Sequence, residues 1–223
     1  MTKKVQNPET DILIESKGKV ESFFDKYGSK LMWALVAITI IAVGIFIWRN
    51  YAESSQQERA AEANKERREL EMKTSAADFS IDYAETAAAY MAIAKKYNDT
   101  AEGNLCYYDA AANYLRAGDL ANAKAALAKF QNVEGDFGAL INAQALILAG
   151  DIAVEEGDFQ TAAAKFEKAL AACNNSNIYG EAALKLGLTY EAMGNDAKAQ
   201  QVYKAAAEKH TSLVAKFAKY IKE

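Results

Sequence analysis

Side chains with intrinsic chemical reactivity are few in this chain and lie far apart. Cys106 and Cys173 are separated by 67 residues and form no CxxC pair, so we expect two small buried side chains. A disulfide would need an oxidising compartment and Cα atoms within about 7 Å. One histidine, His210, cannot build a metal site. Because no phosphate-binding glycine loop or Cys/His motif occurs either, we expect no catalytic residues, no metal and no cofactor.

The composition favours an all-α protein. A chain of 223 residues has room for one globular domain plus an anchor or tail. Hydrophobic residues make up 51%, yet the mean hydropathy is −0.20, so apolar and charged residues are interleaved. Pro8 is the only proline, and no glycine occurs between Gly44 and Gly103. Such alanine-rich, proline-poor sequence forms helices readily and offers little to a sheet.

Net charge argues against nucleic acid as a partner. The formal charge is −4, whereas nucleic-acid-binding domains carry basic patches that neutralise phosphates. The charge divides at the hydrophobic segment: residues 1–30 carry a balance of +1 and residues 49–223 a balance of −5.

One segment has the length and composition of a transmembrane helix. Residues 31–48 read LMWALVAITIIAVGIFIW, with no charge and with Thr39 as the only polar side chain. Eighteen residues span about 27 Å as a helix, close to the hydrocarbon thickness of a bilayer. Trp33 and Trp48 lie near its two ends, followed by Arg49, and are expected at the membrane interface.

Two alternatives to a membrane anchor fit this segment less well. A buried core helix is rarely apolar on every face in so small a domain. A cleavable signal peptide has a shorter apolar core and a small-residue cleavage site, whereas this segment continues directly into Arg49. Four lysines precede it closely (Lys17, Lys19, Lys26 and Lys30). The positive-inside rule then predicts a cytoplasmic N-terminus, with the large domain on the other side of the membrane.

The flanks of the span also suggest helices. Within residues 1–30, Phe23 and Phe24 belong to a set of apolar residues at near-helical spacing among charges. This pattern predicts an amphipathic helix on the membrane lipid or against a membrane partner, or else a partly ordered tail. Residues 49–78 are rich in Ala, Glu, Lys and Arg and predict a helical stalk that joins the first repeat.

A block recurs through residues 79–223. The glycines Gly118, Gly157 and Gly194 are spaced 39 and 37 residues apart, near the 34-residue period of tetratricopeptide repeats. Each is expected to reverse the chain between two antiparallel helices. The blocks that follow them are DLANAKAALAKFQ (119–131), DFQTAAAKFEKAL (158–170) and NDAKAQQVYKAAA (195–207). We predict a tetratricopeptide-like α-solenoid of about three to four helical hairpins, with unrelated hairpins as the alternative.

Small and large residues recur in these blocks and in the helices expected ahead of them. Gly150, Gly187, Ala162 and Ala199 should let paired backbones approach, while Tyr190, Phe166 and Tyr203 fill the space beside them. A degenerate earlier unit, residues 82–100, would pair with the stalk. Residues 211–223 resemble a capping helix that buries Leu213, Val214, Phe217 and Ile221 on one face.

The first helix of each repeat should line a partner-binding groove. Lysine and asparagine, which grip a C-terminal carboxylate in some repeat domains, are absent from the matching positions, so an apolar and aromatic groove is expected instead. Such a groove suits a helix or hydrophobic segment of a partner. The residues expected to line it are Leu105, Tyr108, Leu115, Ile147, Asp151, Leu184 and Leu188.

The junction ESFFDKYGSKL, the span and the exit GIFIWRNYAESSQ resemble the N-terminus of the YfgM family, the ancillary subunit of the bacterial SecYEG translocon. The matching residues are Phe23, Phe24, Lys30, Trp48, Arg49 and Tyr51. The resemblance implies a single-pass inner-membrane protein that contacts SecYEG, a PpiD-type membrane-anchored periplasmic chaperone and translocating polypeptides during export. Two other functions stay open: an envelope scaffold for outer-membrane assembly or cell division, and an organelle-membrane adaptor.

Overall fold

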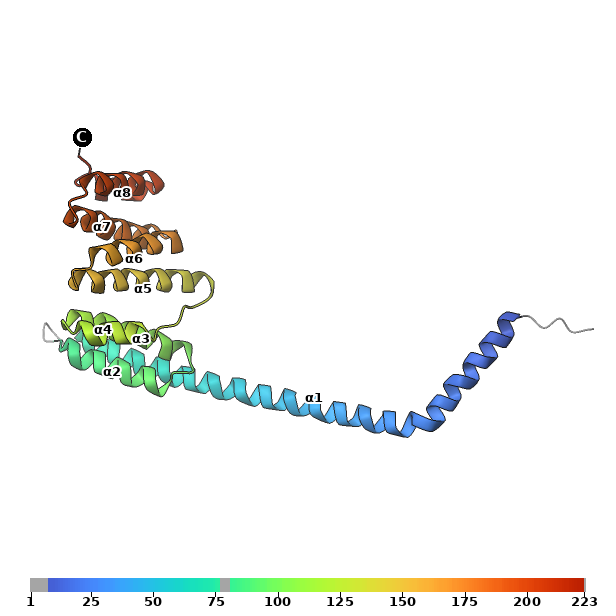
Figure 1. Cartoon of the computed structure of the whole chain (residues 1–223). Helices are drawn as coiled ribbons and strands as arrows, with labels where there is room; N and C mark the ends of the chain where they lie inside the picture. Colours follow the sequence, from blue (N-terminus) through green and yellow to red (C-terminus); the bar gives the residue numbers. More distant parts are fainter. Residues whose placement is uncertain (1–7, 77–80, 223) are drawn as a thin grey trace, which may run out of the picture. The chain divides into compact units, whose positions relative to one another are not determined.

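A computed structural model describes residues 8–76 and 81–222, with side chains for residues 26–30, 32–75 and 81–222 (Figure 1). Secondary structure in these residues is helical, which confirms the all-α prediction. The chain divides into two compact units, Met1–Ser55 and Gln56–Glu223. The boundary lies inside the first helix, α1 (Pro8–Ala76), so each unit is described separately.

The first unit consists of the N-terminal part of α1. Its large apolar side chains from Met32 to Tyr51 are exposed, with Trp33 and Trp48 each at 70%. Thr39, the polar residue of the segment, turns its hydroxyl back to donate to the carbonyl of Leu35 at 2.8 Å. This bond satisfies the hydroxyl within the helix.

Two helical segments among the described residues are long and apolar enough to cross a membrane by length and composition. The first, Lys26–Ser75, contains the predicted span and has an 18-residue window of mean hydropathy 2.5 with none of it buried. The second, Gly135–Glu155, reaches 1.6 and is 44% buried. Core helices and N-terminal signal sequences meet the same criterion. Because the second segment packs within its own unit, we interpret it as a core helix.

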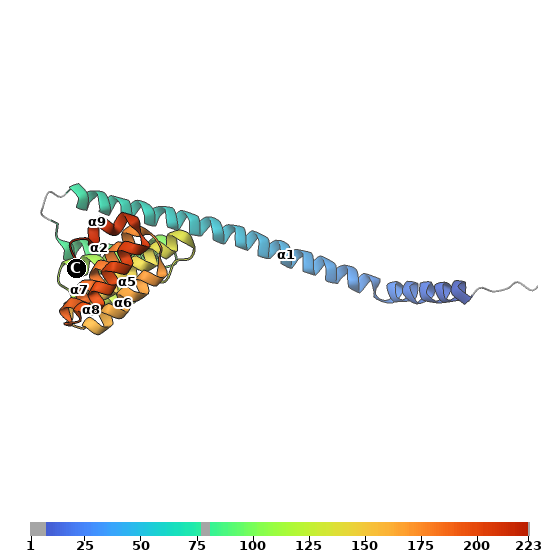
Figure 2. The same cartoon turned by 90° about the horizontal axis from the view of Figure 1, so that it is seen from above.

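The second unit is a stack of antiparallel helix pairs. The end of α1 lies against α2 (Tyr83–Lys96), and three hairpins follow it in chain order (Figure 1). The view turned by 90° superposes successive hairpins, as expected for a stack (Figure 2). The hairpins are α3 (Ala101–Arg116) with α4 (Leu120–Leu127), α5 (Gly135–Glu155) with α6 (Phe159–Ala172), and α7 (Ser176–Ala192) with α8 (Asp196–Lys209).

Each hairpin turn is built from a glycine followed by a capping residue. Gly118, Gly157 and Gly194 have φ of 76°, 77° and 72°, a left-handed conformation that residues with a Cβ adopt at a cost. The predicted turn glycines are therefore confirmed. The next residue caps the second helix: Asp158 and Asn195 accept hydrogen bonds from backbone N–H groups three residues on, at 3.0 and 3.2 Å.

The core is formed by contacts between small and aromatic residues. Gly150 in α5 lies against the ring of Phe166 in α6, and Gly187 in α7 lies against Tyr203 in α8. Both rings are fully buried. Ala162 and Ala199, also fully buried, let the paired backbones approach, as predicted. Alanine-rich helices can therefore form a dense core with few large side chains.

The hairpin of α3 and α4 differs from the predicted repeat. The block 119–131 was expected to continue as helix, but α4 ends at Leu127 after eight residues. Asn104 in α3 donates to the carbonyl of Gln131 and accepts from its N–H, both at 2.7 Å. Asn142 in α5 makes the same pair of bonds to Val133, at 2.8 and 2.9 Å. These four bonds hold the connection in an extended path that a continued helix could not follow.

The C-terminal cap also differs from the prediction. Instead of one helix, the chain forms a 3-10 turn, Thr211–Leu213, followed by the single-turn helix α9, Val214–Phe217. Leu213 and Phe217 are buried as expected, and Ile221 is partly buried against the core. Val214 was expected on the same face but is 51% exposed. The tighter turn ahead of it leaves Leu213 and Phe217 facing the core, so Val214 points away.

Candidate partner-binding groove

Helices α3, α5 and α7, together with Phe159 and Phe166 of α6, line a groove. It consists of two hollows, of about 310 and 430 Å³, that share Leu115 and Asp151. Five of the seven residues predicted to line a groove do so: Tyr108, Leu115, Ile147, Asp151 and Leu188.

The other two predicted groove residues do not line these hollows. Leu105 is partly buried in α3, and Leu184 packs against the core of the last two hairpins. Which residues contact a partner stays a prediction for all seven positions.

A bidentate ion pair crosses the groove. Lys185 Nζ in α7 donates to both carboxylate oxygens of Asp151 in α5, at 2.8 and 2.9 Å. Burial raises the pKa of Asp151, and the hydrogen bond from Lys185 opposes that rise. Sequence reasoning found Asp151 but missed Lys185. The two residues lie 34 apart, one repeat period, and an acid and a base at that spacing would have been a usable signal.

Tyr108 lines the smaller hollow, of about 310 Å³. Its ring lies 6.2 Å from that of Phe130, and burial raises its pKa to about 12. The phenol is therefore neutral at physiological pH and presents a hydroxyl rather than a charge. At the same end of the groove, the Arg116 guanidinium lies 5.8 Å from the ring centroid of Tyr83.

The groove is more polar than the sequence suggested. Leu115, Ile147 and Leu188 supply the apolar surface that was expected. Five polar residues that were not anticipated also line it: Arg116, Gln144, Glu181, Lys185 and Thr189. Alternating apolar and charged surface of this kind can bind an amphipathic segment, with the apolar patches giving affinity and the charges fixing its register.

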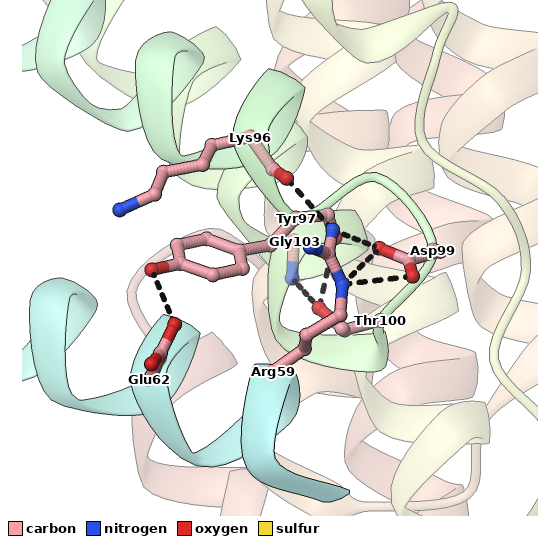
Figure 3. A network of polar contacts seen from close by, with 7 residues as sticks. All are labelled: Arg59, Glu62, Lys96, Tyr97, Asp99, Thr100 and Gly103. Atoms are coloured by element: carbon pink, nitrogen blue, oxygen red, sulfur yellow. Dashed lines mark hydrogen bonds and ion pairs between the residues drawn. The ribbon is translucent and has the colours of Figure 1, made fainter. Parts of the chain in front are cut away.

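A separate polar network attaches α1 to the end of α2 and to the loop between α2 and α3 (Figure 3). Arg59 donates to Asp99 at 2.7 Å and to the carbonyl of Lys96 at 2.9 Å. Tyr97, 1% exposed, donates its hydroxyl to Glu66 at 2.8 Å. Through these bonds α1 becomes the first helix of the stack. Sequence reasoning expected such a helix but did not identify the residues that hold it.

The predicted membrane-interface residues belong to α1. Trp33, Trp48 and Arg49 are exposed. Phe23 and Phe24 are helical, but their side chains lie outside the described residues. Their placement at a membrane surface stays a prediction.

The reactive side chains are buried and separate. Cys106 and Cys173 are free thiols, and burial raises the pKa of Cys106 to about 12, which keeps it protonated. Within residues 26–75 and 81–222, no three His, Cys, Asp or Glu side chains gather in a metal-binding arrangement. His210 is half-buried and packs edge-on to Tyr179, with ring centroids 5.0 Å apart.

Antiparallel helix pairs stacked in chain order, with repeating turn glycines and a groove lined by alternate helices, define a helical-repeat protein of the protein-interaction scaffold class. The family model of the tetratricopeptide repeat-like domain matches residues 21–143, over half of the chain. This chain belongs to that family. No curated protein matches the chain at a significant level of similarity.

Proposed function

We propose that this protein is a single-pass membrane-anchored scaffold that binds protein partners in the groove formed by α3, α5 and α7. One observation carries the proposal: the exposed apolar segment and the first helix of the repeat stack belong to the same helix, α1. The family match supports it, because it begins at residue 21, ahead of the apolar segment, and continues into the repeats.

The apolar segment accounts for membrane attachment energetically. Ten of the residues from 31 to 48 are Leu, Ile, Val or Phe, and each favours insertion by about 0.3–0.6 kcal/mol, giving roughly 3–6 kcal/mol. Among the described residues of the segment, no side chain finds a buried position in the fold. A bilayer would remove this surface from water.

The finer function follows from the resemblance to the YfgM family. As an accessory subunit of SecYEG, the protein would link the translocon to a PpiD-type chaperone, with its N-terminus in the cytoplasm and its repeats in the periplasm. The partner segment would be amphipathic, with an apolar face against Leu115 and Leu188. Its polar face would meet Lys185 and Asp151.

Crosslinking in native membranes tests this assignment. A photoreactive residue at Phe23 should capture translocon subunits, and one at Tyr108 should capture the chaperone or a translocating chain. Exclusive capture of outer-membrane assembly or cell-division proteins would contradict the export role. Digestion of the repeat domain from the cytoplasmic side would contradict the topology.

A matched pair of substitutions tests the groove. Leu188→Glu places a charge in the groove and should weaken crosslinking from position 108 by about tenfold or more, because one buried apolar contact is worth about 1.5–3 kcal/mol. Phe137→Glu changes another exposed apolar residue, outside the groove (63%, against 44% for Leu188), and should leave crosslinking unchanged. Equal effects of both would show that the partner binds elsewhere.

A further inference from the structure

The C-terminal end of the repeat stack has the opposite charge to the rest of the domain. Residues 56–197 carry 13 basic and 22 acidic side chains, a balance of −9. Residues 198–223 carry six lysines against Glu208 and Glu223, a balance of +4. These residues form α8, the 3-10 turn and α9 at the last position of the stack (Figure 1).

Most of these lysines are not neutralised within the fold. Lys222 lies 3.7 Å from Asp196. Lys204, Lys209, Lys216 and Lys219 make no ion pair with any residue in the described part of the chain, and all but the partly buried Lys216 are exposed. We call these four residues the basic cap. Charges left unpaired on one end of an acidic domain are available to an external anion.

Aromatic and apolar groups lie beside the basic cap. The ammonium groups of Lys209 and Lys219 lie 4.1 and 4.9 Å from the ring centroids of Tyr179 and Tyr220. Val214, between them in the chain, is 51% exposed. Lysines mixed with tyrosines and an exposed aliphatic side chain are typical of surfaces that bind at a lipid headgroup boundary.

We propose that the basic cap binds the anionic headgroups of the membrane in which the protein is anchored. The inference rests on the proposed membrane anchor, which would keep the domain near a bilayer at high effective concentration. Each lysine close to an anionic leaflet strengthens binding by about fivefold. The acidic body would be repelled by the same surface, so charge alone favours orienting the cap toward lipid.

An acidic protein segment is the other anion that could bind the lysines. Lipid is favoured because Val214 and the two tyrosines add apolar surface at the same end of the domain, and because the proposed anchor supplies a bilayer without a second partner. The contact should depend steeply on salt, since surface charges are screened over about 10 Å at 0.1 M.

The test uses the full chain in nanodiscs made with phosphatidylcholine alone or with added phosphatidylglycerol. A fluorophore is attached at Ser212→Cys, exposed beside Val214; the native Cys106 and Cys173 are buried and should not label. We expect a lipid-borne quencher to reduce its emission several-fold more in phosphatidylglycerol discs, and the difference to vanish at high salt. A fluorophore at the exposed Ala121→Cys should show no such difference.

A charge-matched pair of variants makes the test specific. Replacing the four basic-cap lysines with glutamine should abolish the quenching difference. Replacing Lys95, Lys129, Lys165 and Lys168 with glutamine removes the same charge elsewhere on the domain and should preserve it. Circular dichroism establishes that both variants are folded.

The outcomes separate this inference from the proposed anchor. A chain that fails to insert into discs would contradict the anchor itself. An inserted chain whose Ser212→Cys fluorophore is equally quenched in both disc types, or unquenched in both, would overturn the lipid inference. The unquenched result would favour an acidic protein segment as the ligand of the lysines.

Discussion

Gly187 in α7 lies directly beneath the ring of Tyr203 in α8, so closely that a Cβ at position 187 would overlap the ring carbons. The ring is fully buried and also packs against Phe217, with centroids 5.7 Å apart. Tyr203 therefore holds α7 against α8 and also connects this last hairpin to the C-terminal cap. In the hairpin before it, the equivalent contact between Gly150 and Phe166 holds α5 against α6.

Gly187→Ala should destabilise the domain although it improves helix propensity. Overpacking costs about 1–3 kcal/mol, whereas the gain from replacing a helical glycine with alanine is about 1 kcal/mol. We expect a net loss of up to about 2 kcal/mol in the free energy of unfolding, measured by urea titration of the full chain in detergent.

Two further variants identify the mechanism of this loss. In a Tyr203→Leu background the added methyl group has space, so Gly187→Ala should cost less than in the native chain. Gly28→Ala, at a helical glycine with no neighbouring atom within 4 Å, should leave the unfolding midpoint of the domain unchanged. An equal cost in both backgrounds would rule out the clash with Tyr203.

The ion pair between Arg67 and Asp109 should matter for docking the end of α1. Arg67 Nε donates to Asp109 Oδ2 at 2.8 Å, and both side chains are largely shielded from water (28% and 18% exposed). Asp109→Ala leaves the guanidinium with only the more exposed carboxylate of Glu71, at 3.1 Å, and should lower the free energy of unfolding by about 1–3 kcal/mol.

A paired replacement is the control for this prediction. Arg67→Met with Asp109→Leu removes both charges and should be closer to the native chain than Asp109→Ala, because neither partner is left desolvated and unpaired. A double variant as unstable as the single one would mean that packing, not charge, is lost.

Asn195, the N-cap residue of α8, should contribute to the stability of the domain through one hydrogen bond. Asn195 Oδ1 accepts from the N–H of Lys198 at 3.2 Å. Asn195→Ala removes it and should cost about 1 kcal/mol, whereas Asn195→Asp keeps an acceptor and should cost little. Thermal unfolding followed by circular dichroism would separate the two variants. Equal losses would assign the effect to the turn rather than to the cap.

Stability should fall on acidification partly through Asp158. Its hydrogen bond with Thr161 lowers the pKa of Asp158 below the ordinary value of 3.8. A carboxyl whose pKa is lowered in the folded state contributes stability above its unfolded pKa. That contribution disappears as the pH falls through the folded value.

Asp158→Asn should therefore flatten the pH dependence of the unfolding midpoint between about pH 5 and 3. Glu134→Gln is the matched control, since Glu134 precedes α5 but its side chain makes no capping hydrogen bond. If the two variants had the same dependence of the unfolding midpoint on pH, a role for the Asp158 cap would be contradicted.

The sequence by itself determined the repeat pattern. Turn glycines such as Gly157, and small residues placed opposite rings such as Phe166, follow from local chain geometry and side-chain volume. Both are visible as spacing along the chain. The same reasoning located most of the groove, because alternate helices of a stack face the same side.

Only the tertiary structure decided where the pattern is interrupted and which charges meet. The helix α4 stops early because Asn104 holds Gln131, which lies 27 residues away in the sequence. Lys185 reaches Asp151, and Arg59 reaches Asp99, only once the helices are packed. Helix propensity acts over one or two turns and reveals neither pair, although the 34-residue spacing of Lys185 and Asp151 matches the repeat period. A hydrogen bond or ion pair depends on atoms brought within about 3 Å by the whole fold.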